Sequence, residues 1–129
     1  MYDLIIELAN DPEKIGAILE NLEGVYCKSI GITREELASV LHIDVQCFDT
    51  PPPSVSLATS CSLLLAGAIV IHSQCVAGYE PGTSRPHWAN FRGFLRRANE
   101  DLGGSTPLET MKRYDGLWDV FNLLRSYEQ

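Results

Sequence analysis

The sequence is poor in the side chains that metal sites and catalytic sites use. It contains three histidines and four cysteines in 129 residues, and their spacing includes no Cys-x-x-Cys pair and no set typical of metal ligands. It also contains no recognisable nucleophile with its base and no glycine-rich phosphate loop. We therefore predict no enzyme activity, no metal and no cofactor. The side chains concerned are Cys27, Cys47, Cys61, Cys75, His42, His72 and His87.

Lysine and arginine are scarce in the first part of the chain. Residues 1–50 hold Lys14, Lys28 and Arg34 against ten acidic residues, whereas residues 51–129 hold seven basic and seven acidic residues. The formal net charge of −7 therefore arises in residues 1–50. A surface that binds phosphates needs clustered basic side chains. This part of the chain is a poor candidate for nucleic-acid binding and is better suited to a basic partner.

Charged side chains are absent from residues 54–78. A helix needs about 20 apolar residues to span a bilayer, but the uninterrupted apolar part, residues 63–71, is only nine residues long. Serines and threonines precede it and His72 follows it. We predict a buried central helix here rather than a membrane span, with His72 at the edge of the core and hydrogen bonded to a partner.

The overall composition is that of a globular protein. Hydrophobic residues make up 45% of the chain and charged residues 21%, a balance that disordered chains lack. The length favours one domain that needs no disulfides. Asp3 and Glu7 interrupt the N-terminal apolar stretch, so we expect no signal sequence, a cytoplasmic location and reduced, buried thiols.

Helical periodicity recurs along the whole chain and predicts an all-α domain of about six to eight helices. We expect an acidic N-terminal part at 1–50, the central helix at 54–78 and a C-terminal region at 87–129, all in one globular unit packed around residues 54–76. So apolar a central helix favours a homodimer. The predicted helices are 2–9, 13–23 (ending at Gly24), 35–42, 54–78, 87–101, 107–113 and 117–127, and the predicted connections include 25–32 and 79–86.

Residues 31–43 are similar to the first helix and turn of a helix-turn-helix, with Thr33 and Glu36 spaced as a capping box. A DNA-reading helix with basic side chains should follow. Residues 44–50 instead contain two acids and no lysine or arginine, and three prolines follow at 51–53. Any second helix is therefore short. Packing or dimerisation is the favoured role for this part, and DNA binding stays as an alternative.

The most specific stretch is residues 94–108. An apolar stripe of Phe94, Leu95, Ala98 and Leu102 predicts a helix that ends where Gly103 takes a positive φ. Thr106 is suited to cap the next helix, which begins with Pro107. On residue chemistry alone this is a tight helix-to-helix corner.

The order of residues in this corner resembles the toxin-binding domain of Xre/MbcA/ParS-type antitoxins. That family carries an aromatic-Leu pair, Pro-Asn, Leu-Gly-Gly and Thr-Pro-Leu-Glu. This chain departs from the pattern at Phe94, where the family usually has Trp, and at Ala98, where it usually has Pro. The resemblance covers mainly residues 94–127. The matching positions are Asn99, Leu102, Gly103, Gly104, Thr106, Pro107, Leu108 and Glu109, and in the closing part Asp115, Gly116, Val120, Leu123, Leu124 and Tyr127.

The resemblance implies a protein that binds a toxin. Members of the family bind RES-type toxins that degrade NAD, and their C-terminal domain blocks entry to the toxin's active site. Carried over to this chain, the resemblance implies a toxin-binding site in which Arg125 and Tyr127 are candidates for reaching the toxin. Two alternatives stay open: a DNA-binding autorepressor, and a stand-alone helical dimer of the same fold. The implied framework of the site is Gly103, Gly104, Thr106, Pro107 and Leu108.

Overall fold

The computed structural model describes residues 2–128, and over this range the regular structure is helical apart from one isolated antiparallel bridge between Tyr79 and Pro86. The predicted all-α class is confirmed. The chain divides into two compact units, residues 1–67 and 68–129. The boundary falls within helix α4, which begins in the first unit and ends in the second.

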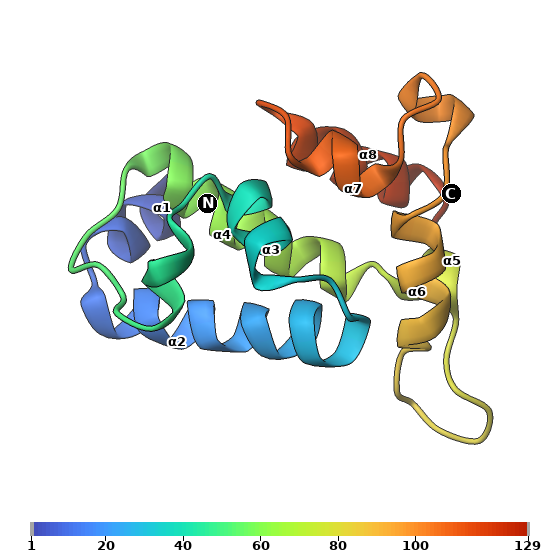
Figure 1. Cartoon of the computed structure of the whole chain (residues 1–129), viewed down its shortest axis with the longest axis horizontal. Coiled ribbons are helices and arrows are strands. Elements are labelled where there is room, and N and C mark those ends of the chain that lie inside the picture. Colours follow the sequence, from blue (N-terminus) through green and yellow to red (C-terminus); the bar gives the residue numbers. More distant parts are fainter. Residues whose placement is uncertain (1, 129) are drawn as a thin grey trace. The chain divides into compact units, whose positions relative to one another are not determined.

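The first unit is built from helical elements joined by short connections (Figure 1), and side chains cap the starts of α2 and α3. The Asp11 carboxylate accepts the Lys14 backbone N–H ahead of Pro12, and Thr33 and Glu36 form the predicted capping box. These caps supply acceptors for N–H groups that a helix start leaves unpaired. The elements are α1 (Tyr2–Ala9), α2 (Pro12–Glu23), the π-helix η1 (Gly24–Ile30), α3 (Arg34–Leu41), the 3₁₀ turn η2 (Val45–Phe48) and the start of α4 (Leu57–Ile71).

Two buried hydroxyls connect α4 to the rest of the first unit. The Tyr26 phenol is fully buried and donates to the Ala66 carbonyl at 2.6 Å. The Ser60 hydroxyl, also fully buried, donates to the Ile5 carbonyl at 2.7 Å. Each bond joins segments far apart in sequence, so α4 is held to α1 and η1 by polar contacts as well as by packing. The apolar core around them includes Ile15, Leu19, Leu22, Ile30, Leu37, Leu41 and Leu63.

The prediction that the α-helix ends at Gly24 is confirmed, but the prediction that residues 25–32 form a connector is wrong. Gly24 has helical dihedral angles, φ −59° and ψ −46°, and the chain continues as η1 to Ile30. The turn in the left-handed region comes at Gly31, with φ 96°. Tyr26 and Ile30 are fully buried, so tertiary packing favours continued helix where a glycine alone suggested an end.

The central apolar segment is broken, whereas the sequence predicted one helix over 54–78. The helix α4 ends at Ile71, and α5 (Gln74–Ala77) begins after a turn. By length and composition, Leu57–Ala77 is long and apolar enough to cross a membrane, with a mean hydropathy of 1.6, a test that core helices of soluble proteins also pass. Ser60 and the Ala66 carbonyl both take part in side-chain hydrogen bonds within the first unit. We therefore interpret α4 as a core helix.

The second unit contains five further helical elements (Figure 1). Contacts join α5 to α6, α6 to α7 and α7 to α8. Their buried side chains include Phe91, Leu95, Met111, Leu117, Val120 and Leu124. The elements are α5, α6 (Trp88–Leu95), the 3₁₀ turn η3 (Glu100–Leu102), α7 (Pro107–Met111) and α8 (Gly116–Ser126).

The predicted helix over 87–101 is also wrong. The helix α6 ends at Leu95, and Asn99 takes an extended conformation, φ −127° and ψ 123°, ahead of η3. Ala98 is exposed, so it does not belong to the inner face on which the sequence placed it. Within α6, Phe91 and Leu95 are buried, and the Phe94 ring stacks on Phe91 with 5.9 Å between centroids.

Candidate functional site

The corner between α6 and α7 is organised by Asn99. Its side-chain oxygen accepts the Asp101 N–H at 2.9 Å, which begins η3. Its backbone N–H donates to the Ser105 carbonyl at 3.0 Å, and its own carbonyl accepts the Gly104 N–H at 2.9 Å. Asn99 therefore closes the loop at both of its ends. Because these three bonds use one residue, the corner has a single defined conformation.

The two glycines of the corner are required by backbone conformation. Gly103 has φ 70° and Gly104 has φ 88°, values that side chains rarely allow. A Cβ atom at either position would meet nothing within 4 Å, so close packing is not the reason for glycine here. Both residues are exposed. The corner thus presents main-chain atoms to the surface, and the predicted positive φ at Gly103 is confirmed.

Thr106 starts α7 as the sequence predicted. Its hydroxyl oxygen accepts the Glu109 N–H at 3.0 Å, and its hydroxyl lies 3.0 Å from the Glu109 carboxylate, to which it donates. Pro107 occupies the first helical turn. Pro107 and Leu108 are both buried. Their side chains therefore belong to the core of the second unit, not to its surface.

The two predicted tail residues lie in different surroundings. The Arg125 guanidinium lies over the Phe121 ring, 5.8 Å from its centroid, and its side chain is exposed. Tyr127 follows the end of α8 and is 42% exposed. The phenol therefore has access both to solvent and to the surface of the second unit.

An open pocket of about 390 Å³ brings the corner and the tail together. Tyr127 lines this pocket beside Phe94 and Asn99. Arg125 is not among its lining residues. Of the predicted site residues, Tyr127 therefore lies beside Phe94 and Asn99, at the start of the stretch that resembles the antitoxin family. Gly103 and Gly104 do not line the pocket. The lining consists of Cys75, Val76, Phe94, Arg97, Ala98, Asn99 and Tyr127.

A second hollow of about 470 Å³ lies in the same unit. It is lined on one side by Leu102 of η3 and Thr110 of α7, and on the other by Asn122, Leu123 and Ser126 of α8. Leu102 and Leu123 are both positions of the signature. Leu102 of the corner and Leu123 of the last helix therefore line the same hollow.

Beside the first pocket, Glu128 joins two side chains from the beginning of the second unit. Its Oε1 atom lies 2.5 Å from His72 Nδ1 and 3.1 Å from the Cys75 thiol, which donates to it. The bonds from His72 and then Cys75 hold the pKa of the Glu128 carboxyl below its ordinary value. Burial, followed by the bond to Glu128, raises the pKa of the Cys75 thiol. A raised pKa makes this thiol a weaker nucleophile at neutral pH.

The prediction that His72 has a hydrogen-bond partner is confirmed, and the partner is Glu128. The His72 ring also packs edge to face on the Phe121 ring, with 5.5 Å between the ring centroids. Over residues 2–128, no three His, Cys, Asp or Glu side chains are arranged to hold a metal ion. The four cysteines, all among residues 2–128, form no disulfide and are partly exposed, so the expectation of buried thiols is wrong.

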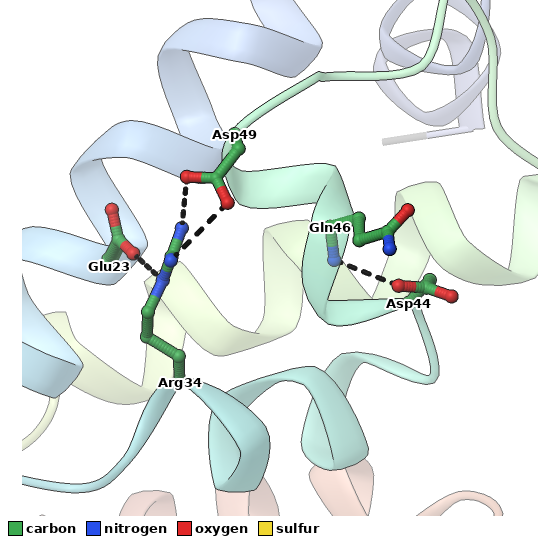
Figure 2. A network of polar contacts seen from close by, with 5 residues as sticks. All are labelled: Glu23, Arg34, Asp44, Gln46 and Asp49. Atoms are coloured by element: carbon green, nitrogen blue, oxygen red, sulfur yellow. Dashed lines mark hydrogen bonds and ion pairs between the residues drawn. The ribbon is translucent and has the colours of Figure 1, made fainter.

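In the first unit, the helix-turn-helix likeness ends at η2, a single 3₁₀ turn capped by Asp44. Figure 2 shows the surroundings of Arg34, which follows the Thr33 cap. Its guanidinium pairs with Glu23 and with Asp49, at 2.9 Å for the latter, and lies over the Phe48 ring. This arginine fastens α3 to α2 and η2. Its positive charge is therefore paired with two acids within the protein.

Sequence reasoning missed Arg97, Cys75 and Glu128 as neighbours of Tyr127, and it named Asn99 only as a matching position. The pattern Asn-x-Asp, in which an Asn side chain caps the second residue after it, was a local signal for the turn at Asn99. The contact between His72 and Glu128 spans 56 residues. No local pattern could have revealed it. Neither a scan against models of protein families nor a search of curated proteins finds a match to this chain.

Proposed function

We propose that this protein is an antitoxin-like inhibitor whose C-terminal unit binds and blocks a RES-type, NAD-degrading toxin. The observation that carries the proposal is the pocket in which Phe94, Asn99 and Tyr127 meet. These positions come from the two separate stretches that resemble the antitoxin family. A shared surface is what a common binding role would require, since residues so far apart in sequence need not otherwise lie together.

The chemistry of the tail supports the same proposal. Arg125 offers a planar guanidinium and Tyr127 a phenol, and both are exposed. A guanidinium suits phosphate and carboxylate oxygens, which it can contact with two parallel bonds. A toxin site that holds a dinucleotide also needs acceptors for the ribose hydroxyls and the amide of its ligand, and a guanidinium and a phenol can donate to such acceptors. The tail would occupy the entrance to that site and exclude the dinucleotide.

The test is co-expression of this chain with the protein encoded beside it, scoring growth and co-purification on a tag carried by the neighbour. Growth rescue, retained cellular NAD and a stable complex are expected. A chain truncated after Leu124 should form a weaker complex and lose protection. The proposal fails if the neighbour is harmless and no complex forms, or if the truncated chain protects as well as the full chain.

Point variants separate the tail chemistry from general damage. Tyr127→Phe and Arg125→Gln should each reduce protection. Tyr114→Phe is the matched control, because Tyr114 is 86% exposed and lines neither pocket of the second unit. Arg85→Gln, in the loop at 79–86, is the control for Arg125. Equal loss in the test and control variants would contradict the tail assignment.

The proposal includes a cytoplasmic homodimer, which sedimentation equilibrium of the purified chain tests as a doubling of mass.

The alternative of a DNA-binding repressor has less support. Its reading helix would have to be η2, which is four residues long, and the basic Arg34 beside it is engaged by two acids. A short 3₁₀ turn without basic side chains is poorly suited to the major groove.

A further inference from the structure

Tyr127 and Glu128, the last described residues, are held in place beyond the end of α8. The helix α8 ends at Ser126, and Tyr127 and Glu128 continue beyond it. The backbone N–H groups of both residues still donate to carbonyls of α8, at 3.2 and 3.1 Å. These bonds continue the turn. By themselves they would not hold the tail against another part of the unit.

The Glu128 side chain supplies that anchor. One oxygen of its carboxylate is hydrogen bonded to both His72, which follows α4, and Cys75, which lies in α5. These two residues precede Glu128 by 56 and 53 positions in the sequence. His72 also packs edge to face against Phe121, within α8. Phe121 and Glu128 therefore both attach α8 and the residues after it to residues 72–75. While these contacts hold, Tyr127 and Glu128 cannot move independently of the unit.

Tyr127 is placed by the same contacts. It is the neighbour of Glu128 in sequence, and it lines the pocket together with Cys75 and Val76 of α5. Cys75 therefore takes part in both features. Fixing the Glu128 carboxylate on His72 and Cys75 fixes the backbone from which the Tyr127 phenol extends.

We propose that Glu128 is a positioning residue, which holds the C-terminal tail on His72 and Cys75 so that Tyr127 is set in the pocket wall before any partner binds. Its value for binding rests on the proposed function. A tail that is already ordered does not lose its conformational freedom on binding, so pre-organisation increases affinity. The anchor itself is a property of the isolated protein.

The first experiment needs no partner. Backbone ¹⁵N relaxation of the full chain gives the order parameter of Tyr127, which should be about 0.8 in the native protein and fall below about 0.6 in Glu128→Ala and in His72→Ala. Glu80→Ala, an acid of the loop at 79–86 in the same unit, is the matched control and should leave the value unchanged. The proposal is overturned if Tyr127 is equally mobile in the native protein, or equally ordered in both anchor variants.

Glu128→Gln separates hydrogen bonding from charge. An amide oxygen can still accept from His72 and from the thiol, so Tyr127 should remain more ordered than in Glu128→Ala.

Site-resolved alkylation of Cys75, read by mass spectrometry, should be faster in Glu128→Ala than in the native chain because the tail no longer covers the thiol. An unchanged alkylation rate in Glu128→Ala would overturn the anchor.

The second experiment uses the neighbouring protein as the binding partner. If it binds, Glu128→Ala should raise the dissociation constant of the complex by about ten-fold, while Glu80→Ala should leave it unchanged. Equal affinity for the native chain and Glu128→Ala would overturn the positioning role. If the neighbour binds no form of the chain, the proposed function fails, and the relaxation data still decide whether Glu128 anchors the tail.

Discussion

Single buried groups decide much of the stability of the first unit, and Tyr26 is the clearest case. Its ring is fully buried and its phenol donates to the Ala66 carbonyl. Burial raises the pKa of Tyr26 far above the ordinary tyrosine value of 10.0, because the charged phenolate would lose its hydration. The neutral phenol is therefore the form that the folded chain requires.

The sign of the resulting pH dependence follows from the direction of that shift. The folded-state pKa is raised, so the stabilisation is fully present below pH 10 and is lost as the pH rises further. We expect urea unfolding of the native chain to show falling stability from pH 10 to 11. Tyr26→Phe should be less stable at pH 8, by about 1 kcal/mol for the lost hydrogen bond, and should have a flatter alkaline slope. Identical slopes would contradict this account.

Gly116 is the residue at which space is most limited. A Cβ atom there would lie 1.6 Å from the Thr110 carbonyl oxygen, a backbone atom that cannot turn aside. We expect Gly116→Ala to lower the free energy of unfolding by about 3 kcal/mol or more, in line with severe overpacking. Gly93→Ala is the matched control within α6, since its Cβ would meet only the end of Arg97 at 3.9 Å. That variant should be neutral or more stable by about 0.5 kcal/mol, as chemical denaturation would show.

At the level of elements, local signals predicted helix starts better than helix ends. Thr33 and Thr106 were identified as caps because their hydrogen-bond partners lie three residues away in the sequence. The connector predicted at 25–32 was wrong because Gly24 is compatible with helix and the buried Tyr26 favours the π-helix η1. The end of α6 was misplaced because the apolar spacing of Ala98 and Leu102 continues through a turn that Asn99 sets.

The same distinction applies to the candidate site. The corner at Gly103, Gly104 and Thr106 is encoded locally, so it could be predicted from positive-φ and capping preferences. The approach of Tyr127 to Asn99, and the bond between His72 and Glu128, depend on how α5, α6 and α8 pack. Sequence periodicity gives the faces of those helices but not their pairing.

The cap of α7 gives a prediction at this scale. Thr106→Ala removes the oxygen that accepts the Glu109 N–H and leaves that group unpaired. We expect a loss of about 1 kcal/mol in the free energy of unfolding, measured by urea titration followed by circular dichroism. Thr106→Ser should keep most of the native stability because it retains the hydroxyl. A neutral Thr106→Ala would mean that the corner is held by Asn99 and the glycines alone.

For the whole molecule, the uneven charge limits the range of partners. The net charge of −7 comes from the first 50 residues, where Lys14 pairs with Glu7, and Arg34 with Glu23 and Asp49. We expect no binding to the DNA upstream of its own gene at about 150 mM salt, measured by fluorescence anisotropy of labelled duplex. Tight binding that weakens steeply as salt increases would instead restore the autorepressor alternative.

The π-helix η1 has a consequence for how relatives of this chain would differ from it. Its Gly31 N–H donates to the Tyr26 carbonyl, an i→i+5 bond that takes one residue more than an α-helical turn. The capped starts of α2 and α3 fix the segments on either side. A sequence lacking one residue between 24 and 30 could close the same span with ordinary α-helical bonds, so insertions and deletions among divergent copies should accumulate here.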